Sequence, residues 1–412
     1  MALTYLWSGF FLVGIAAAVL QWLATGDGAV FKKIIDGTFA AARLAVMDIS
    51  LPLAGVMTFW LGMLSVGEKA GVIAVVSRWI APLFSRLFPS VPRDHPAHGH
   101  MIMNYSANFL GLDNAATPLG LKAMKSLQEL NPQKDTASDA QLMFLVIQTS
   151  GLTLIPLSVI AQRAVLGAAN PTDIFIPTLI ATYCATLVAI LLCGWKQKIR
   201  LADPVIIGWL GGITAGLAGL VWALTTQLTR EQIETVSLVV SNLILAGIIA
   251  VFLAFGLARR INVYEAFIEG AKEGVQTALT ILPYLVAMLV AISVLRNSGV
   301  LDLAVAGFAW FFGWLGLATD WVAALPTALM KPISGSGARA MFIDAMKTYG
   351  VDSFVGRLAS VLQGATDTTL YIIALYFGTV GVTKVRYGLA FGLLADLAGI
   401  VAAIFVAYLF FG

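Results

Sequence analysis

The chain has 412 residues, of which 59% are hydrophobic and only 11% are charged, and its mean hydropathy is +0.89. Soluble domains carry about 25% charged residues, so this composition excludes a soluble protein and predicts an all-α polytopic membrane protein. The net charge of +3 does not favour a nucleic-acid partner, and Cys184 and Cys193 are too few for a disulfide framework.

Apolar segments long enough to cross a bilayer recur along the whole chain. The N-terminal one has no basic region before it, so we expect a retained helix rather than a signal peptide. Amphipathic helices are predicted at residues 31–46 and 263–278, because apolar residues recur there at helical spacing. In chain order, the predicted spans are residues 3–23, 49–66, 140–166, 174–193, 205–224, 236–257, 279–295, 354–377 and 387–411.

Four other segments do not read as simple spans. Residues 72–88 carry Arg78 and Arg86, so we expect this segment to lie at the membrane interface or to form one limb of a re-entrant hairpin. Residues 301–317 are the equivalent apolar segment of the second half. Residues 101–121 and 321–341 are polar and rich in glycine, which favours hairpins that enter the membrane and return.

The pattern of residues 31–193 restarts at residues 263–411. Basic residues at 196–200 and 259–260 flank the two central spans, which places both loops in the cytoplasm. Three crossings in each repeat then give the halves opposite orientations, although Arg339 and Lys347 fall outside on this topology. The sequence therefore predicts two inverted-topology repeats with broken helices and re-entrant hairpins, as in many secondary transporters.

Two polar motifs interrupt long apolar segments at corresponding positions of the two halves. One runs from Gln148 to Pro156 and the other from Gln363 to Tyr371. Polar breaks that recur in both halves of a membrane protein point to a central solute site. We therefore expect these side chains to bind solute: Gln148, Ser150, Thr153, Gln363, Thr366 and Thr368.

The two polar hairpins supply further candidates. In residues 103–118 we expect solute binding by Asn104, Asn108, Asn114 and Thr117; the alternative is hydrogen bonding between helices. In residues 330–339, Ser334 and Ser336 lie in a glycine-rich turn whose backbone N–H groups can face an anion, or the turn is only a flexible tip.

Two carboxylates are candidates for coupling to a cation. Asp113 and Asp367 lie in predicted membrane segments, where a carboxylate is costly unless it is functional or paired. They suit Na⁺ coordination or proton carriage. The alternatives are a position of Asp113 near the interface and an ion pair of Asp367 with Lys331 or Arg339.

Metal and catalytic chemistry have weaker support in the sequence. One candidate for metal binding is the group His95, His98 and His100. The alternative is that these residues belong to a solvated loop at the membrane interface, and this alternative is favoured because charged residues lie next to them. The chain carries no nucleophile, HExxH or nucleotide-binding motif. We therefore expect no enzyme activity, no bound metal and no cofactor, with Na⁺ only as a coupling ion.

Longer motifs resemble two related families. The motifs at residues 59–63, 94–96, 108–124 and 131–139 resemble bacterial spore maturation protein A. Those at residues 263–267, 269–274, 281–291, 334–337 and 356–360 resemble spore maturation protein B. The resemblance suggests a fusion, with residues 1–200 as an A-like half (an extra N-terminal helix plus repeat 1) and residues 201–412 as a B-like half (two linker helices plus repeat 2).

The resemblance implies a nucleoside recognition or gate-type membrane domain, similar to those of concentrative nucleoside transporters and the ferrous-iron transporter B. It also implies a link to spore core dehydration and permits a homo-oligomer. His98 and His100 depart from the family pattern, so the resemblance does not extend to metal binding.

These features together predict a multi-pass protein of the bacterial inner membrane that transports or exports a small polar solute, coupled to Na⁺ or H⁺. Its expected partners are the lipid bilayer and the solute. A non-transporting scaffold for spore or envelope maturation is the alternative, in which the polar motifs pack dry. A third hypothesis, an intramembrane enzyme, requires two carboxylates that face each other in a closed wet cavity.

Overall fold

The computed structural model describes residues 2–111, 113–227 and 230–412. The side chains of residues 2–3, 113–115, 224–225, 230–231, 233–234 and 237 lie outside this description. The described chain is helical, and its β-structure is limited to an isolated bridge between Thr136 and Lys384. Eight helical segments in it are long and apolar enough to cross a membrane. The prediction of an all-α polytopic membrane protein is confirmed.

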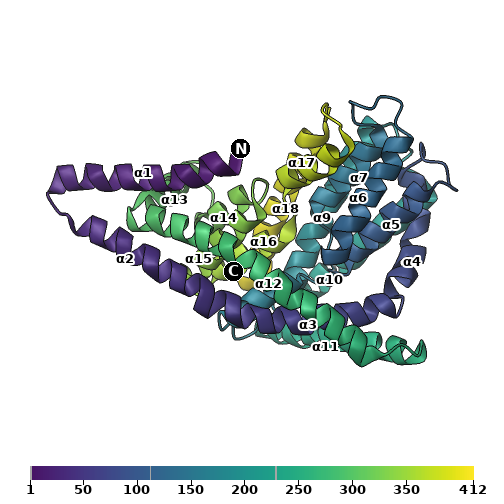
Figure 1. The fold of residues 1–412 in the computed structure, drawn as a ribbon, viewed down its shortest axis with the longest axis horizontal. Coiled ribbons are helices and arrows are strands. Elements are labelled where there is room, and N and C mark those ends of the chain that lie inside the picture. The colour runs from purple at the N-terminus through teal and green to yellow at the C-terminus, as the bar shows by residue number, and fades with distance from the viewer. Residues whose placement is uncertain (1, 112, 228–229) are drawn as a thin grey trace.

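Two very long helices form one side of the molecule (Figure 1). Helix α2 (Ala29–Arg43) continues through a π-helical turn, Leu44–Ser50, into α3 (Leu51–Lys69), and α12 (Val263–Asn297) lies beside them. The prediction that each amphipathic helix is separate from the span after it is therefore wrong.

Packing between the two long helices explains their continuity. A Cβ on Gly274 would lie only 2.6 Å from the Cα of Thr58, so the backbones of α12 and α3 touch. In such close packing, tertiary contacts stabilise a helix more than its own propensity does. The amphipathic part of each long helix therefore continues without a break into the part that spans the membrane.

Broken helices and helical hairpins make up much of the rest. Helices α7 and α8, and likewise α16 and α17, are separated by short non-helical breaks. Helices α5 and α6, and likewise α14 and α15, pack as pairs joined by short turns. Their bounds are α5 (Pro96–Phe109), α6 (Asp113–Glu129), α7 (Asp139–Ser150), α8 (Leu157–Val165), α14 (Leu325–Met330), α15 (Gly335–Tyr349), α16 (Phe354–Ala365) and α17 (Thr369–Val380).

Two unbroken helices hold these pieces together. Helix α9 (Phe175–Lys196) packs along α18 (Gly388–Phe411), and α16 contacts both (Figure 1). The halves therefore share one interior. The predicted division at residues 200 and 201 falls in the loop after α9 and stays a prediction.

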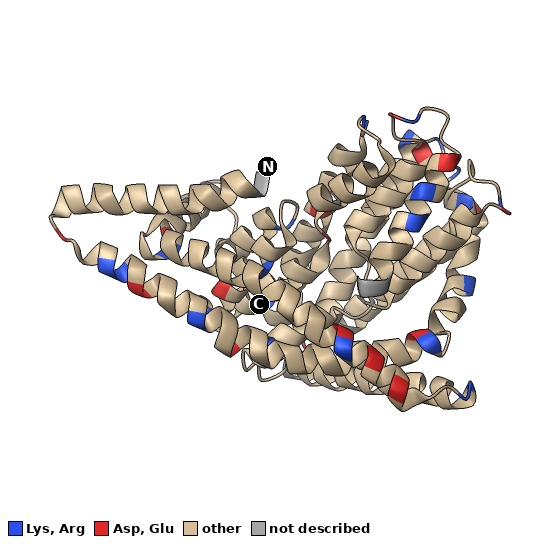
Figure 2. Cartoon of the chain, in the orientation of Figure 1, with Lys and Arg blue, Asp and Glu red and all other residues tan. Residues whose placement is uncertain are grey.

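Peripheral helices present apolar side chains outward. They are α1 (Ala2–Thr25), α4 (Val72–Leu87), α10 (Pro204–Gln227), α11 (Arg230–Ala258) and α13 (Val300–Trp314). Trp222, Leu243 and Trp310 are each more than half exposed, and charged residues gather mainly near helix ends and in loops (Figure 2). An apolar surface this extensive suits lipid rather than water.

Candidate functional site

The breaks of the two broken helices touch each other. Helix α7 ends at Ser150 and is capped by Gly151, whose φ of +63° is the left-handed conformation that glycine adopts without strain. The backbone N–H of Asp367, in the other break, donates a 2.9 Å hydrogen bond to the carbonyl of Thr149. A Cβ on Gly151 would lie 3.0 Å from that nitrogen, so glycine also permits this close approach.

Each break is also bonded to the turn of a helical hairpin. The N–H of Leu154 donates to the carbonyl of Phe109 across 2.7 Å, at the end of α5. The N–H of Leu370 donates to the carbonyl of Pro332 across 3.0 Å, in the turn between α14 and α15. The same contact thus recurs in both halves, and four helix interruptions meet at one place.

A cavity of about 310 Å³ lies at this meeting point. Its volume is at the lower end of the range for small-molecule pockets. Eight of the predicted site residues line it: Asn108, Thr117, Gln148, Thr153, Gln363, Thr366, Asp367 and Thr368. The structure thus brings together candidates from both halves, while their binding of solute stays a prediction.

Four predicted site residues do not line the cavity and instead bond to neighbouring helix atoms. Asn104 donates to the carbonyl of Ala116 across 2.7 Å. The Ser150 hydroxyl bonds the carbonyl of Ile147 and lies 2.8 Å from the Thr186 hydroxyl. For Asn104 the alternative of hydrogen bonding between helices fits better.

The serines of the second hairpin have local roles. The Ser334 hydroxyl accepts a 3.1 Å bond from the N–H of Gly337 and caps α15, and it lies 3.2 Å from the Ser336 hydroxyl. The side chains of Asp113 and Asn114, at the start of α6, lie outside the described part of the structure.

Two amides in the cavity wall have atoms without a hydrogen-bond partner among the described residues: the Oε1 atom of Gln363 and the Nδ2 atom of Asn108. The Gln363 side chain is almost fully buried. Buried polar atoms are nearly always bonded in folded proteins, so these two point to a ligand or water in the cavity.

Charge in the cavity wall comes from the second half. Lys331, Arg339 and Asp367 line the cavity, and Lys331 is 8% exposed. Sequence reasoning considered Lys331 and Arg339 only as ion-pair partners of Asp367 and not as site residues. Because Lys331 and Arg339 lie beside a polar helix break, they could have been predicted as residues of the site.

A carboxylate that sequence reasoning missed lies directly behind this wall. Asp396, on α18, is 1% exposed and accepts a 2.7 Å bond from the hydroxyl of Thr369 at Oδ2. Its other oxygen has no hydrogen-bond partner in the described chain. A single carboxylate inside the apolar segment 387–411 was a visible signal, because buried carboxylates in membranes are rarely incidental.

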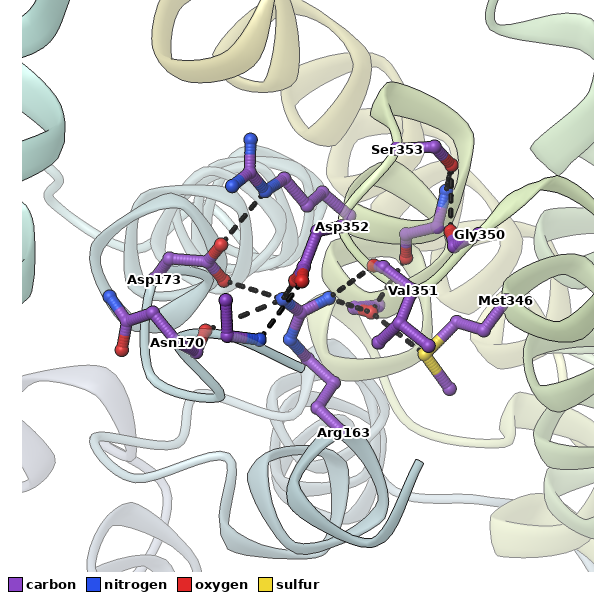
Figure 3. A network of polar contacts seen from close by, with 12 residues as sticks. Arg163, Asn170, Asp173, Met346, Gly350, Val351, Asp352 and Ser353 are labelled. Atoms are coloured by element: carbon purple, nitrogen blue, oxygen red, sulfur yellow. Dashed lines mark hydrogen bonds and ion pairs between the residues drawn. The ribbon is translucent and has the colours of Figure 1, made fainter. Parts of the chain in front are cut away.

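A buried cluster of charges joins the two halves near the end of α8 and the start of α16 (Figure 3). Arg163, which is fully buried, pairs with Asp173 across 3.0 Å and with Asp352 across 3.1 Å. Arg357 bonds Asp173 from the other half across 2.9 Å. Burial raises the pKa of Asp173, against the attraction of both arginines.

A more exposed cluster joins the halves near the start of α7 and the end of α17. Lys384 pairs with Asp135 across 2.7 Å and Arg386 pairs with Asp139 across 2.8 Å. The hydrogen bond from Lys384 holds the pKa of Asp135 below its ordinary value, so this carboxyl group is ionised at neutral pH. Ion pairs thus connect the halves at both far ends of the broken helices.

The three histidines bond to separate partners. His95 caps α5, His98 lies 3.1 Å from the carbonyl of Val91, and His100 lies 2.9 Å from the Ser126 hydroxyl. Among the described residues no group of three or more potential ligands is placed to hold a metal. His98 and His100 lie within α5, and His98 is buried, so the favoured alternative of a solvated loop is wrong for these two residues.

The geometry of the cavity can be compared with known proteins. A family model described as "Gate: Nucleoside recognition" matches residues 50–165 and 278–383. The chain belongs to this Gate family. Apart from Thr277, every residue that lines the cavity falls within the two Gate segments.

Two curated relatives of this Gate protein come from Bacillus subtilis (strain 168). Spore maturation protein B is 48% identical over 182 residues, which are 44% of this chain and 98% of that protein. Spore maturation protein A is 42% identical over 161 residues, which are 39% of this chain and 82% of that protein. The resemblance predicted from the sequence motifs is confirmed.

Proposed function

We propose that this Gate-family membrane protein is a secondary transporter or exporter of a small polar solute. The observation that carries the proposal is the cavity at which two helix breaks and two hairpin turns meet. Interrupted backbone at membrane depth is tolerated where it is buried in protein or lines a wet cavity. A solute site at this point would account for all four helix interruptions, each of which costs free energy in a membrane.

The solute would bond to side chains from both halves. Asn108, Thr117, Gln148 and Thr153 would contact it from the first half, and Gln363, Thr366 and Thr368 from the second. The amide atoms of Asn108 and Gln363 that lack a partner in the described part of the chain support this role, because leaving a buried polar group unbonded costs about 1–3 kcal/mol. A bound solute would relieve that cost.

Coupling to Na⁺ or H⁺ would use the carboxylates near the cavity. Asp367 lines it, and we retain Asp113 as a second candidate. Asp396 joins them because it is buried directly behind Thr369 and one of its oxygens has no hydrogen-bond partner among the described residues. A carboxylate so placed gains most from a proton or a cation.

Alternating access would follow from movement of one half against the other, as inverted-topology repeats permit. The ion-pair clusters at the two ends of the broken helices would then act as closures. Opening one end would separate Arg163 from Asp352, and opening the other would separate Asp139 from Arg386. We place the protein in the bacterial cytoplasmic membrane, where it acts without catalysis, as a monomer or a homo-oligomer.

The experiment is thermal unfolding of the purified protein with a panel of nucleosides, amino acids, dipeptides and dicarboxylates, each with and without Na⁺. A ligand that binds the folded state raises the melting temperature by mass action. We expect one class to do so, and we expect Thr366→Val and Asp367→Asn to abolish the shift. Thr379→Val, on the exposed part of α17, is the matched control. A scaffold with a dry cavity predicts no shift with any solute.

A further inference from the structure

We infer that the protein binds the headgroup of an anionic phospholipid at a second site, a pocket between the end of α4 and the loop that joins α9 to α10. The phosphate of the lipid would be held by Arg93, Lys198 and Arg200. This pocket shares no lining residue with the central cavity, so the inference does not rest on the proposed function.

Basic side chains from two distant parts of the chain meet in this pocket. Its volume is about 400 Å³, and its charged lining residues are Arg86, Arg93, Lys198, Arg200 and a single carboxylate, Asp203. Because cations gathered around one hollow raise the local electrostatic potential, this pocket favours an anionic ligand.

The carboxylates near the pocket neutralise little of this charge. One oxygen of Asp203 lies 3.6 Å from the Nε atom of Arg86, and the other accepts a 2.9 Å hydrogen bond from the N–H of Val205 at the start of α10. Asp94 follows Arg93 in the sequence, but it is exposed and does not line the pocket. Among the basic residues of the pocket, Arg86 is therefore the one with a carboxylate partner in the described chain.

The other basic residues are available to a ligand. The side chains of Arg93, Lys198 and Arg200 are exposed, and none of them makes an ion pair or hydrogen bond with another described residue. Guanidinium and ammonium groups bind phosphate oxygens through charge-assisted hydrogen bonds. A phosphate group therefore suits the pocket.

Backbone hydrogen bonds hold both loops in place. In the loop after α9, the N–H of Ile199 donates to the carbonyl of Gly194 across 2.9 Å, which fixes the turn that carries Lys198. In the loop after α4, the carbonyl of Val91 lies 3.1 Å from the ring of His98, which is buried in α5. The basic side chains thus extend from ordered backbone, so little order has to be gained on binding.

Tryptophans place the pocket at the surface of the membrane. Trp79 on α4 and Trp209 on α10 pack edge to face with their ring centroids 5.5 Å apart. Trp79 is 73% exposed, and Trp195, in the last turn of α9, is 72% exposed. Indole rings concentrate at the membrane–water interface, and basic pockets between helices bind anionic lipid headgroups there. The ligand is therefore a lipid, whose acyl chains would lie against the exposed apolar side chains of α4 and α10.

The test is lipid binding to the purified, delipidated full chain in detergent, measured by native mass spectrometry. The probes are phosphatidylglycerol, cardiolipin and phosphatidylcholine with the same acyl chains. We expect the two anionic lipids to bind about tenfold or more tightly than phosphatidylcholine and to raise the melting temperature. Inorganic phosphate at the same concentration should not displace them, because it has no acyl chains.

Variants then locate the headgroup. Lys198→Gln with Arg200→Gln should weaken binding of the anionic lipids about tenfold or more, and Arg93→Gln, on the other side of the pocket, about fivefold. Arg259→Gln with Arg260→Gln should leave it unchanged. This control is matched, because it removes two charges from a basic loop outside the pocket, and Arg260 has a φ of +56° where Lys198 has +55°. The melting temperature without lipid confirms that each variant is folded.

Three results would overturn the inference. Equal binding of phosphatidylcholine and the anionic lipids would reject a headgroup site. Equal losses in the pocket variants and in the control would show that the lipids respond only to overall charge. Displacement by inorganic phosphate at the same concentration would identify a site for a soluble anion instead of a lipid. None of these results bears on transport through the central cavity.

Discussion

Asp367 and Thr149 join the two helix breaks through a 2.9 Å hydrogen bond between their backbones. Thr149 lies in the last turn of α7 in the first half, and Asp367 lies between α16 and α17 in the second. The bond therefore fixes the distance between the breaks at the point where the cavity opens between them. Any change that separates these two residues should disturb the cavity before the rest of the fold.

Gly151→Ala should disturb this contact directly. The added Cβ would meet the Asp367 nitrogen at 3.0 Å and would also strain a left-handed residue by about 1–2 kcal/mol. Gly167→Ala is the matched control, because Gly167 has a φ of +82° but open space around it. We expect the melting temperature to fall further for Gly151→Ala. Equal falls would mean that the breaks are not in close contact.

Arg163→Met should destabilise the protein strongly. The change removes the ion-pair partner of Asp352 and leaves Asp173 with Arg357, and breaking a buried ion pair from one side costs about 3–5 kcal/mol. Lys384→Met, in the exposed cluster, should cost only about 0–1 kcal/mol. Denaturant unfolding in detergent compares the two. A similar loss for both would contradict the buried position of Arg163.

Asp396→Asn should uncouple transport while it keeps the fold. An amide oxygen can still accept the hydrogen bond from Thr369, so the packing of α18 is retained. The amide cannot bind a proton or balance a cation. We expect a solute that binds the unmodified protein to bind the variant, while uptake into proteoliposomes no longer responds to a Na⁺ or pH gradient. Unchanged gradient dependence would exclude Asp396 from coupling.

Much of the helix arrangement could be predicted because hydropathy and polar breaks are properties of the local sequence. The interruptions near Ser150 and Thr366 stood out because polar residues and glycine replace leucine inside apolar segments. The continuity of α2 with α3 could not be predicted in this way. It depends on packing against α12, more than 200 residues away in the chain.

The candidate site could be predicted in part for the same reason. Gln148 and Gln363 lie in the last turns of α7 and α16, directly before the breaks, so the local sequence located them. Ser150 is the last residue of α7, next to the break, but its hydroxyl turns toward Thr186 on α9, a contact that only the fold decides. Asp396 could not be found in this way, because it is a single carboxylate in an otherwise apolar span and lies outside both polar motifs.

A disulfide across the exposed cluster should arrest transport. Thr136 and Lys384 are partners in a β-bridge, and such neighbours lie about 4.8 Å apart, within reach of a disulfide. In a background with Cys184 and Cys193 changed to serine, Thr136→Cys with Lys384→Cys should lose solute uptake on oxidation and regain it on reduction. Each single cysteine variant is the control. Uptake that continues in the oxidised protein would show that this end need not open.

The most direct test of the central claim is labelling of one cavity residue from the two sides of the membrane. Thr153→Cys, in the background without Cys184 and Cys193, is exposed to a membrane-impermeant thiol reagent in right-side-out and in inside-out vesicles. A cavity with alternating access predicts labelling in both preparations, because each end opens in turn. Labelling from one side only, or from neither, would contradict the account.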